Sequence, residues 1–155
     1  MNYSIMNKGG YMRFDIEFPH KLVSAYNEMC KLLCQKLKLP QTAFDILMFL
    51  SNNPQYTSAR DIVEVRKLKA NLVSINIDKL VKEGYLIRKE VTGDRRKTAL
   101  ICTPKASEIV KVGRDLQEKF VYTLFRGLDE EDQEVMGRIM NVMESNIDKI
   151  LEEYK

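Results

Sequence analysis

The sequence predicts a mainly α-helical protein with one small β-hairpin. Apolar residues recur at helical spacing along almost the whole chain of 155 residues. Only after Gly84 does the period change from 3.6 to 2, over two short runs, 85–91 and 97–102, which the turn-forming Thr92-Gly93-Asp94 separates. A new helix is then signalled by Thr103-Pro104, with threonine at the N-cap and proline in the first turn.

Two helices are expected before residue 55. The first runs from near Pro19 to near Lys36, and the second follows Leu39-Pro40 and ends at Asn52-Asn53-Pro54. The ten residues at the N-terminus are interpreted as a loose lead-in that ends in Gly9-Gly10. One face of the first helix is apolar and consists of Leu22, Tyr26, Met29, Leu33 and Leu37.

A pair of helices joined by a short polar turn is expected next. Ser58 can cap a brief helix over 59–65, with Asp61 three residues later as in a capping box. The turn Arg66-Lys67-Leu68 leads into a second helix over 69–83, which Gly84 ends as a C′ glycine.

The last helix is expected to start near Asp129 and run to Lys155, after a break at Gly127. It carries a second apolar stripe beside a two-heptad seam, and a helix that is apolar on more than one side needs more than one partner surface. A second copy of the protein would supply that surface and make a homodimer, although packing within one chain would also cover both stripes. The seam consists of Met136, Met140, Met143, Ile147 and Ile150.

Positive charge is concentrated in the middle of the chain. Residues 57–106 hold 12 basic and 6 acidic residues, a net charge of +6, whereas the flanks hold 13 basic and 16 acidic residues. This asymmetry favours a local anionic partner, although a solvated basic face would give the same pattern. No stretch is long and apolar enough for a membrane span, and the N-terminus lacks a secretion signal, so we expect a cytoplasmic protein.

The order helix, short helix, turn, helix, strand, basic tip, strand is the plan of a winged helix-turn-helix, a DNA-binding architecture. Its second helix can enter the major groove, where asparagine reads adenine, lysine meets guanine or phosphate, and an apolar side chain such as Ile75 contacts a thymine methyl group. The hairpin tip can reach the minor groove with Arg95, Arg96 or Lys97. The predicted contacts of the helix come from Lys69, Asn71, Leu72, Ser74, Ile75 and Asn76.

Two segments resemble the multiple-antibiotic-resistance regulator (MarR) family of transcription regulators. Asp94-Arg95-Arg96-Lys97, followed by a strand and Cys102-Thr103-Pro104-Lys105-Ala106, resembles the family's wing, and 72–86 looks like its recognition helix with the Leu-x-x-x-Gly exit. Ile75 departs from the pattern, because many relatives carry arginine there. Ala106 and Cys102 replace the usual glycine and leucine.

The resemblance implies a division of the chain and roles for its residues. It implies a DNA-binding lobe over 39–106 and a discontinuous helical dimerisation region over 1–38 and 107–155. Asp94 would hold Arg96 in place for the minor groove. The function implied is that of a homodimeric repressor that binds a pseudo-palindromic duplex and responds to a small aromatic effector, with His20 and Tyr26 as candidate lining.

Other functions find less support in the residues. No catalytic motif and no cofactor motif is present, so no enzyme and no cofactor are expected. Three scattered cysteines and one histidine lack the spacing of a zinc site. Cys30 and Cys34 leave open a thiol-based redox sensor, against the interpretation that they are small packing residues. A winged-helix module that binds protein instead of DNA is the remaining alternative.

Overall fold

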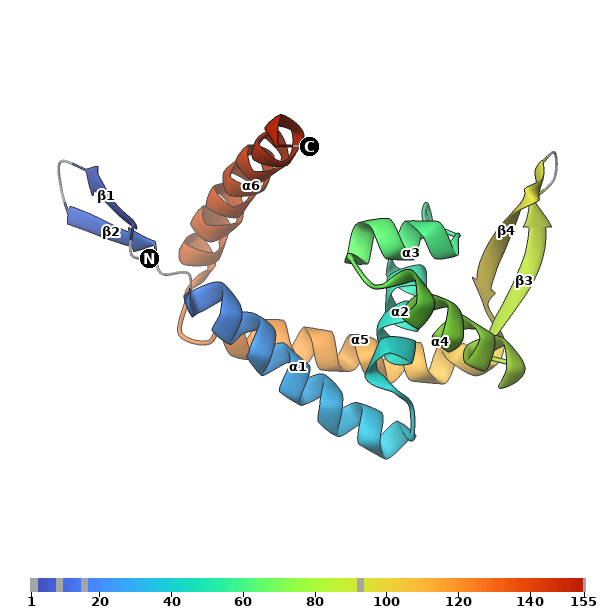
Figure 1. The fold of residues 1–155 in the computed structure, drawn as a ribbon. Coiled ribbons are helices and arrows are strands. Elements are labelled where there is room, and N and C mark those ends of the chain that lie inside the picture. Colours follow the sequence, from blue (N-terminus) through green and yellow to red (C-terminus); the bar gives the residue numbers. More distant parts are fainter. Residues whose placement is uncertain (1–2, 8–9, 15–16, 92–93, 155) are drawn as a thin grey trace. The chain divides into compact units, whose positions relative to one another are not determined.

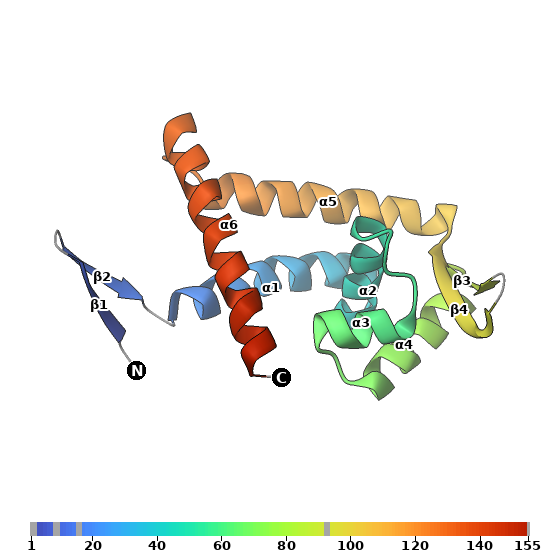
Figure 2. The ribbon, with the colours of Figure 1, turned by 90° about the horizontal axis from the view of Figure 1, so that it is seen from above.

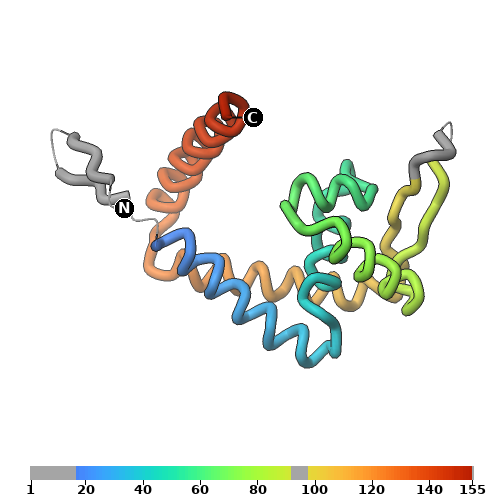
Figure 3. The backbone as a smooth tube through the Cα atoms, viewed as in Figure 1, coloured from blue at the N-terminus to red at the C-terminus, as the bar shows by residue number. Residues whose placement is uncertain are grey.

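A computed structural model describes residues 3–7, 10–14, 17–91 and 94–154, and the side chains of 17–91 and 98–154. The chain divides into two compact units, 1–117 and 118–155. Figure 1 shows the elements of each unit, and Figure 3 shows the course of the backbone. The mainly helical fold with one hairpin in the middle of the chain is as the sequence predicts.

Helix α2 (Gln41–Asn52) forms the centre of the first unit. It follows α1 (Glu17–Leu37), whose inner face buries Cys30 and Cys34. In Figure 2, α2 lies between α5 (Pro104–Leu124) and the pair formed by α3 (Ala59–Arg66) and α4 (Ala70–Lys82). The buried residues of α2 are Ala43, Phe44, Ile46, Leu47, Met48, Phe49 and Leu50. A helix apolar on all sides is typical of a position inside a core.

Strands β3 (Leu86–Val91) and β4 (Asp94–Cys102) form an antiparallel hairpin. Leu86 lies opposite Cys102 and Glu90 opposite Thr98, and the register shifts between Glu90 and Val91. The predicted turn residues 92 and 93 lie outside the described residues. At the base of the hairpin, the Thr103 hydroxyl donates to the Gly84 carbonyl at 2.7 Å, so this side chain joins α5 to the end of α4.

The last helix, α6 (Glu130–Glu153), belongs to the second unit and begins as predicted. The carboxylate of Asp129 accepts a hydrogen bond from the Asp132 amide at 2.8 Å and caps the helix. Three acidic residues lie in its first turn, where the helix dipole favours negative charge.

The N-terminal segment differs from the expected loose lead-in. Its described residues form two antiparallel strands, β1 (Tyr3–Asn7) and β2 (Gly10–Phe14), with Ile5 opposite Met12. The prediction was wrong because short runs rich in strand-forming residues on either side of a Gly-Gly pair are a hairpin signal in the sequence that helical periodicity does not register.

Two helices end with the same backbone motif but with different residues. After α4, the Tyr85 amide donates to the Leu80 carbonyl and the Gly84 amide to Val81, with Gly84 at φ +79°. After α1, the Leu39 amide donates to the Cys34 carbonyl in the same way, but Lys38 takes the left-handed position at φ 54°. Both are Schellman motifs, in which glycine has the lowest conformational cost.

We therefore expect opposite effects from exchanging these residues. Gly84→Ala should lower the free energy of unfolding by about 1–2 kcal/mol, because no atom lies within 4 Å of an added Cβ and only the left-handed backbone opposes it. Lys38→Gly should raise it by up to about 1 kcal/mol. Urea unfolding measures both changes in the free energy of unfolding. Equal stability of Gly84→Ala and the parent chain would contradict the assignment of Gly84 to a Schellman motif.

Candidate nucleic-acid interface

Helices α3 and α4 are held together by local signals in the sequence. The Ser58 side chain accepts from the Asp61 amide at 3.1 Å, while the Asp61 carboxylate accepts from the Ser58 amide at 2.8 Å, which confirms the predicted capping box. Lys67 then turns the chain with φ 53°. Leu68 packs against the core beside the fully buried Ile62. Figure 3 shows the path of the backbone through this turn into α4.

Most of the predicted contact residues of α4 are exposed. Lys69, Asn71 and Ser74 are accessible, and so are the two apolar residues Leu72 and Ile75, which are 40% and 65% exposed. The opposite face is buried in the core through Val73, Ile77 and Leu80. One helix therefore presents a fixed inner face and a free outer face.

Asn76 does not belong to the free face, so its predicted outward position is wrong. Its side chain is 6% exposed, and its amide nitrogen donates to the Leu72 carbonyl at 2.8 Å. The bond to the carbonyl four residues earlier satisfies the amide within the helix and allows it to be buried. On the helix, Asn76 lies beside the buried Val73 and Ile77, a placement that depends on tertiary packing.

Asn71 is exposed but already uses one of its polar atoms. Its side-chain oxygen accepts a hydrogen bond from the Leu72 amide at 2.8 Å. The two hydrogens of its amide nitrogen can donate to base acceptors in this conformation. Bidentate recognition of adenine uses the oxygen as well, and its two lone pairs allow it to accept from a base beside the Leu72 amide.

The hairpin is attached to the lobe at several points. The Leu100 amide donates to the Thr57 carbonyl at 2.7 Å, and the Arg88 guanidinium pairs with Asp78 of α4 at 2.5 Å. Asp94 pairs with Val91 through the backbone at the far end of the strands. The side chains of Asp94, Arg95, Arg96 and Lys97 lie outside the described residues.

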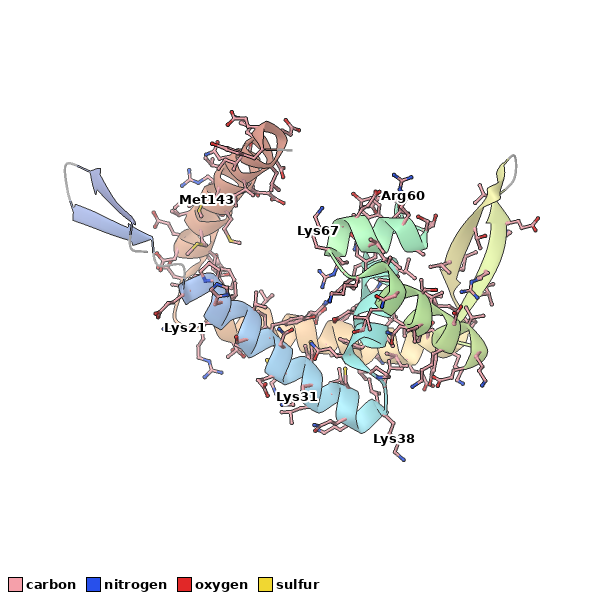
Figure 4. All side chains as sticks on the ribbon, viewed as in Figure 1. Lys21, Lys31, Lys38, Arg60, Lys67 and Met143 are labelled. Atoms are coloured by element: carbon pink, nitrogen blue, oxygen red, sulfur yellow. The ribbon has the colours of Figure 1, made fainter. Side chains whose placement is uncertain are left out.

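The basic side chains of the lobe fall into two groups. Some are engaged: Arg60 pairs with Glu64 at 2.6 Å, and the Lys105 ammonium donates to the Glu83 carbonyl and lies 4.5 Å from the centre of the Tyr85 ring. Lys67 and Lys69 lie on either side of Leu68, just before α4, and are exposed. In Figure 4, Arg60 and Lys67 mark the two ends of α3 and point away from it.

A cavity of about 230 Å³ lies in the first unit and is lined by residues of α1, α2, α3 and α5. Burial raises the pKa of the Asp45 carboxyl, which the charge of Arg66 partly offsets. Burial also raises the pKa of Tyr26 to about 12, and its hydroxyl accepts from the Gln117 amide at 3.0 Å. Tyr26 was predicted to line such a cavity, whereas His20 is exposed and does not. The lining comprises Tyr26, Asp45, Met48, Phe49, Asn52, Asn53, Arg66 and Gln117.

The two cysteines of α1 are packing residues. Cys30 is 0% and Cys34 5% exposed, and burial raises the pKa of both thiols, to about 11 for Cys34. A reactive thiol needs access and a lowered pKa, so the structure favours the packing interpretation.

Within the described part of the chain, no group of three or more metal-ligating side chains is present, and no helix is long and apolar enough to cross a bilayer.

The predicted seam of α6 is exposed within the single chain. None of the described residues of this helix is buried, and Met143, labelled in Figure 4, is 43% exposed. The other seam residues, Met136, Met140, Ile147 and Ile150, are between 39% and 55% exposed.

Comparisons with known proteins agree with this architecture. The MarR family model matches residues 37–97. A MarR protein from Peptoclostridium difficile superposes with a TM-score of 0.74 at 20% identity, over 97% of both chains. A putative MarR family transcriptional regulator from Listeria monocytogenes, solved with a 26mer DNA, gives 0.75 at 18% identity, over 88% of this chain and 90% of the other. No curated protein matches the chain significantly.

These likenesses show that the chain has a winged-helix fold with helical flanks. The family match covers α2, α3, α4, β3 and the start of β4. The match makes this part of the chain similar to the MarR family.

Asn76 and Ser74 provide a test of the two faces of α4. Asn76→Asp should lower the free energy of unfolding at pH 7 by about 1–3 kcal/mol, because a buried carboxylate cannot donate to the Leu72 carbonyl. Ser74→Asp introduces the same charge on the exposed face and should change it by less than about 0.5 kcal/mol. Equal effects in urea unfolding would contradict the assignment of Asn76 to the core.

Proposed function

We propose that this protein is a homodimeric, sequence-specific DNA-binding transcription regulator that acts as a repressor. One observation carries the proposal: α4 exposes Asn71 and Ser74 on a helix whose other face is fixed in the core. Such side chains read base edges when the helix lies in the major groove. Residues 57–106, which include α4, carry a net charge of +6. The Listeria protein of the same fold was solved with DNA, which supports this use of the lobe.

The wing supplies the second part of the proposed interface. From the family resemblance, Arg96 enters the minor groove and Asp94 orients it. Arginine suits this role because its planar guanidinium is weakly hydrated and directional. The Arg88–Asp78 pair supports the wing by tying the first strand of the hairpin to α4, so that helix and hairpin contact DNA as one body.

Dimerisation is proposed through α6 and the other helical flanks. The residues that support it are the exposed seam, Met136, Met140, Met143, Ile147 and Ile150. A continuous exposed apolar stripe of this kind typically marks an interaction surface. In this proposal residues 1–38 and 107–155 form the dimerisation region, and residues 39–106 form the DNA-binding lobe.

A small aromatic effector is the proposed input. The cavity beside Tyr26 and Phe49 supports it, because an aromatic wall and the polar groups of Asp45, Arg66 and Gln117 converge on it. It adjoins both α1 of the assembly region and α2 of the DNA-binding lobe. A ligand there can therefore change how the two regions meet.

The first test is duplex binding as a function of salt. A dimer that neutralises several phosphates should lose orders of magnitude in affinity between about 50 and 200 mM salt, on a pseudo-palindromic site with half-sites about one helical turn apart. Arg96→Ala should weaken binding to many sequences, and most with A·T-rich flanks. Fluorescence anisotropy with duplexes selected from a random library measures this.

Asp94→Ala separates an orienting role from simple charge. Removing a negative charge beside DNA strengthens binding by electrostatics alone, whereas loss of an orienting partner of Arg96 weakens it. We expect weaker binding at fixed salt. Tighter binding would refute the role carried over from the family, and failure to select any duplex would favour a protein-binding module.

The second test concerns assembly. The double variant Met140→Glu/Ile147→Glu should convert the dimer to monomer or unfold it, because four charges would enter an apolar interface. Asn141→Glu/Ser145→Glu adds the same charge to exposed polar positions of α6 and should leave the dimer intact. Sedimentation equilibrium at micromolar concentration provides the measurement, and a monomeric wild-type chain would contradict dimerisation.

A further inference from the structure

Helix α4 carries an exposed apolar pair in the middle of its polar face. Leu72 and Ile75 are 40% and 65% exposed, whereas Val73, Ile77 and Leu80 are at most 1% exposed. Leu72 and Ile75 are three residues apart and therefore neighbours on the helix surface. Ile75 leaves about two thirds of its surface in water, so the packing of the described residues does not explain an apolar side chain at this position. The pair is therefore available to contact a ligand.

The charge around the pair selects the ligand. Exposed Lys67 and Lys69 lie just before the helix, and the surrounding residues 57–106 have a net charge of +6. A second copy of the lobe would bring like charge against like charge, while DNA brings the opposite charge. The flanking Asn71 and Ser74 are suited to base edges. This step rests on the proposed DNA-binding function.

On a DNA base edge, only one group matches an apolar side chain. In the major groove, thymine alone among the four bases carries a C5-methyl group. Side chains three residues apart on a helix are about 5–6 Å from one another, and successive base pairs along one strand are about 3.4 Å apart. The two side chains therefore reach base pairs that are adjacent or one step further apart.

We propose that Leu72 and Ile75 form a methyl-reading patch that recognises the C5-methyl groups of pyrimidines in each half-site. Thymine supplies this methyl in ordinary DNA. 5-Methylcytosine carries the same group at the same ring position, so a methylated cytosine substitutes for thymine in this contact. The protein therefore distinguishes methylated from unmethylated cytosine where its half-site holds cytosine at that position.

The test removes single methyl groups from the DNA. Duplexes selected by the protein from a random library are resynthesised with deoxyuridine in place of thymidine, one position at a time. Burial of one methyl corresponds to about a fourfold change in Kd. We expect one or two positions per half-site at which deoxyuridine weakens wild-type binding about fourfold, and we expect 5-methylcytosine to bind more tightly than cytosine there.

Variants of the patch assign the effect to its residues. In Ile75→Ala, replacing thymidine by deoxyuridine should leave the Kd nearly unchanged. Ile75→Val should keep most of the fourfold increase in Kd. Val112→Ala, at an exposed apolar position of α5, should keep the full penalty. Circular dichroism and urea unfolding show whether each variant is folded, which the exposure of Ile75 leads us to expect.

The outcomes separate this inference from the function on which it rests. Salt-dependent, sequence-selective binding that is unchanged by deoxyuridine at every position would overturn the methyl-reading patch and leave the regulator intact. A penalty of the same size in wild type, Ile75→Ala and Val112→Ala would also overturn it. A chain that selects no duplex would overturn both proposals.

Discussion

The arrangement of the first unit depends on the burial of α2 on all its sides. Seven of its twelve residues are in the core, so the surrounding elements are placed by the need to cover it. On the side of α5, Gly113 makes this possible, because a Cβ there would overlap the Met48 sulfur and lie 3.0 Å from the Phe44 ring. On the other side, α4 covers α2 with Val73 and Ile77. The orientation of α4 is therefore a consequence of core packing.

Core packing of this kind leaves the outer face of α4 free to vary. The free energy that holds the helix comes from its buried positions, and surface substitutions away from such contacts usually change stability little. Lys69, Asn71, Ser74 and Ile75 can therefore be chosen for recognition alone. Asn76 marks the boundary, because its side chain returns to the backbone of its own helix.

The sequence predicts those features that local chemistry decides. The capping box at Ser58, the left-handed Gly84 and the proline that starts α5 depend on neighbouring residues only, and each occurs where it was expected. The burial of Asn76 could not be predicted, because it depends on which side of α4 meets α2. The cavity beside Asp45 joins residues from four helices far apart in the sequence, and no local pattern signals it.

The hydrogen-bond state of Asn71 and the apolar patch point to the same kind of base pair. An A·T pair presents, on one major-groove edge, the adenine atoms that an asparagine amide can pair with and the thymine methyl that an apolar side chain can cover. Asn71 precedes Leu72 directly and lies four residues before Ile75, so the amide and the patch occupy adjoining positions on the exposed face of α4. The Asn71 oxygen has two lone pairs, so it can accept from an adenine amino group while it keeps its bond to the Leu72 amide. Methyl burial by Leu72 and Ile75 on the same or the next pair would add to the adenine contact of Asn71, so the two contacts together would prefer A·T pairs more than either contact alone.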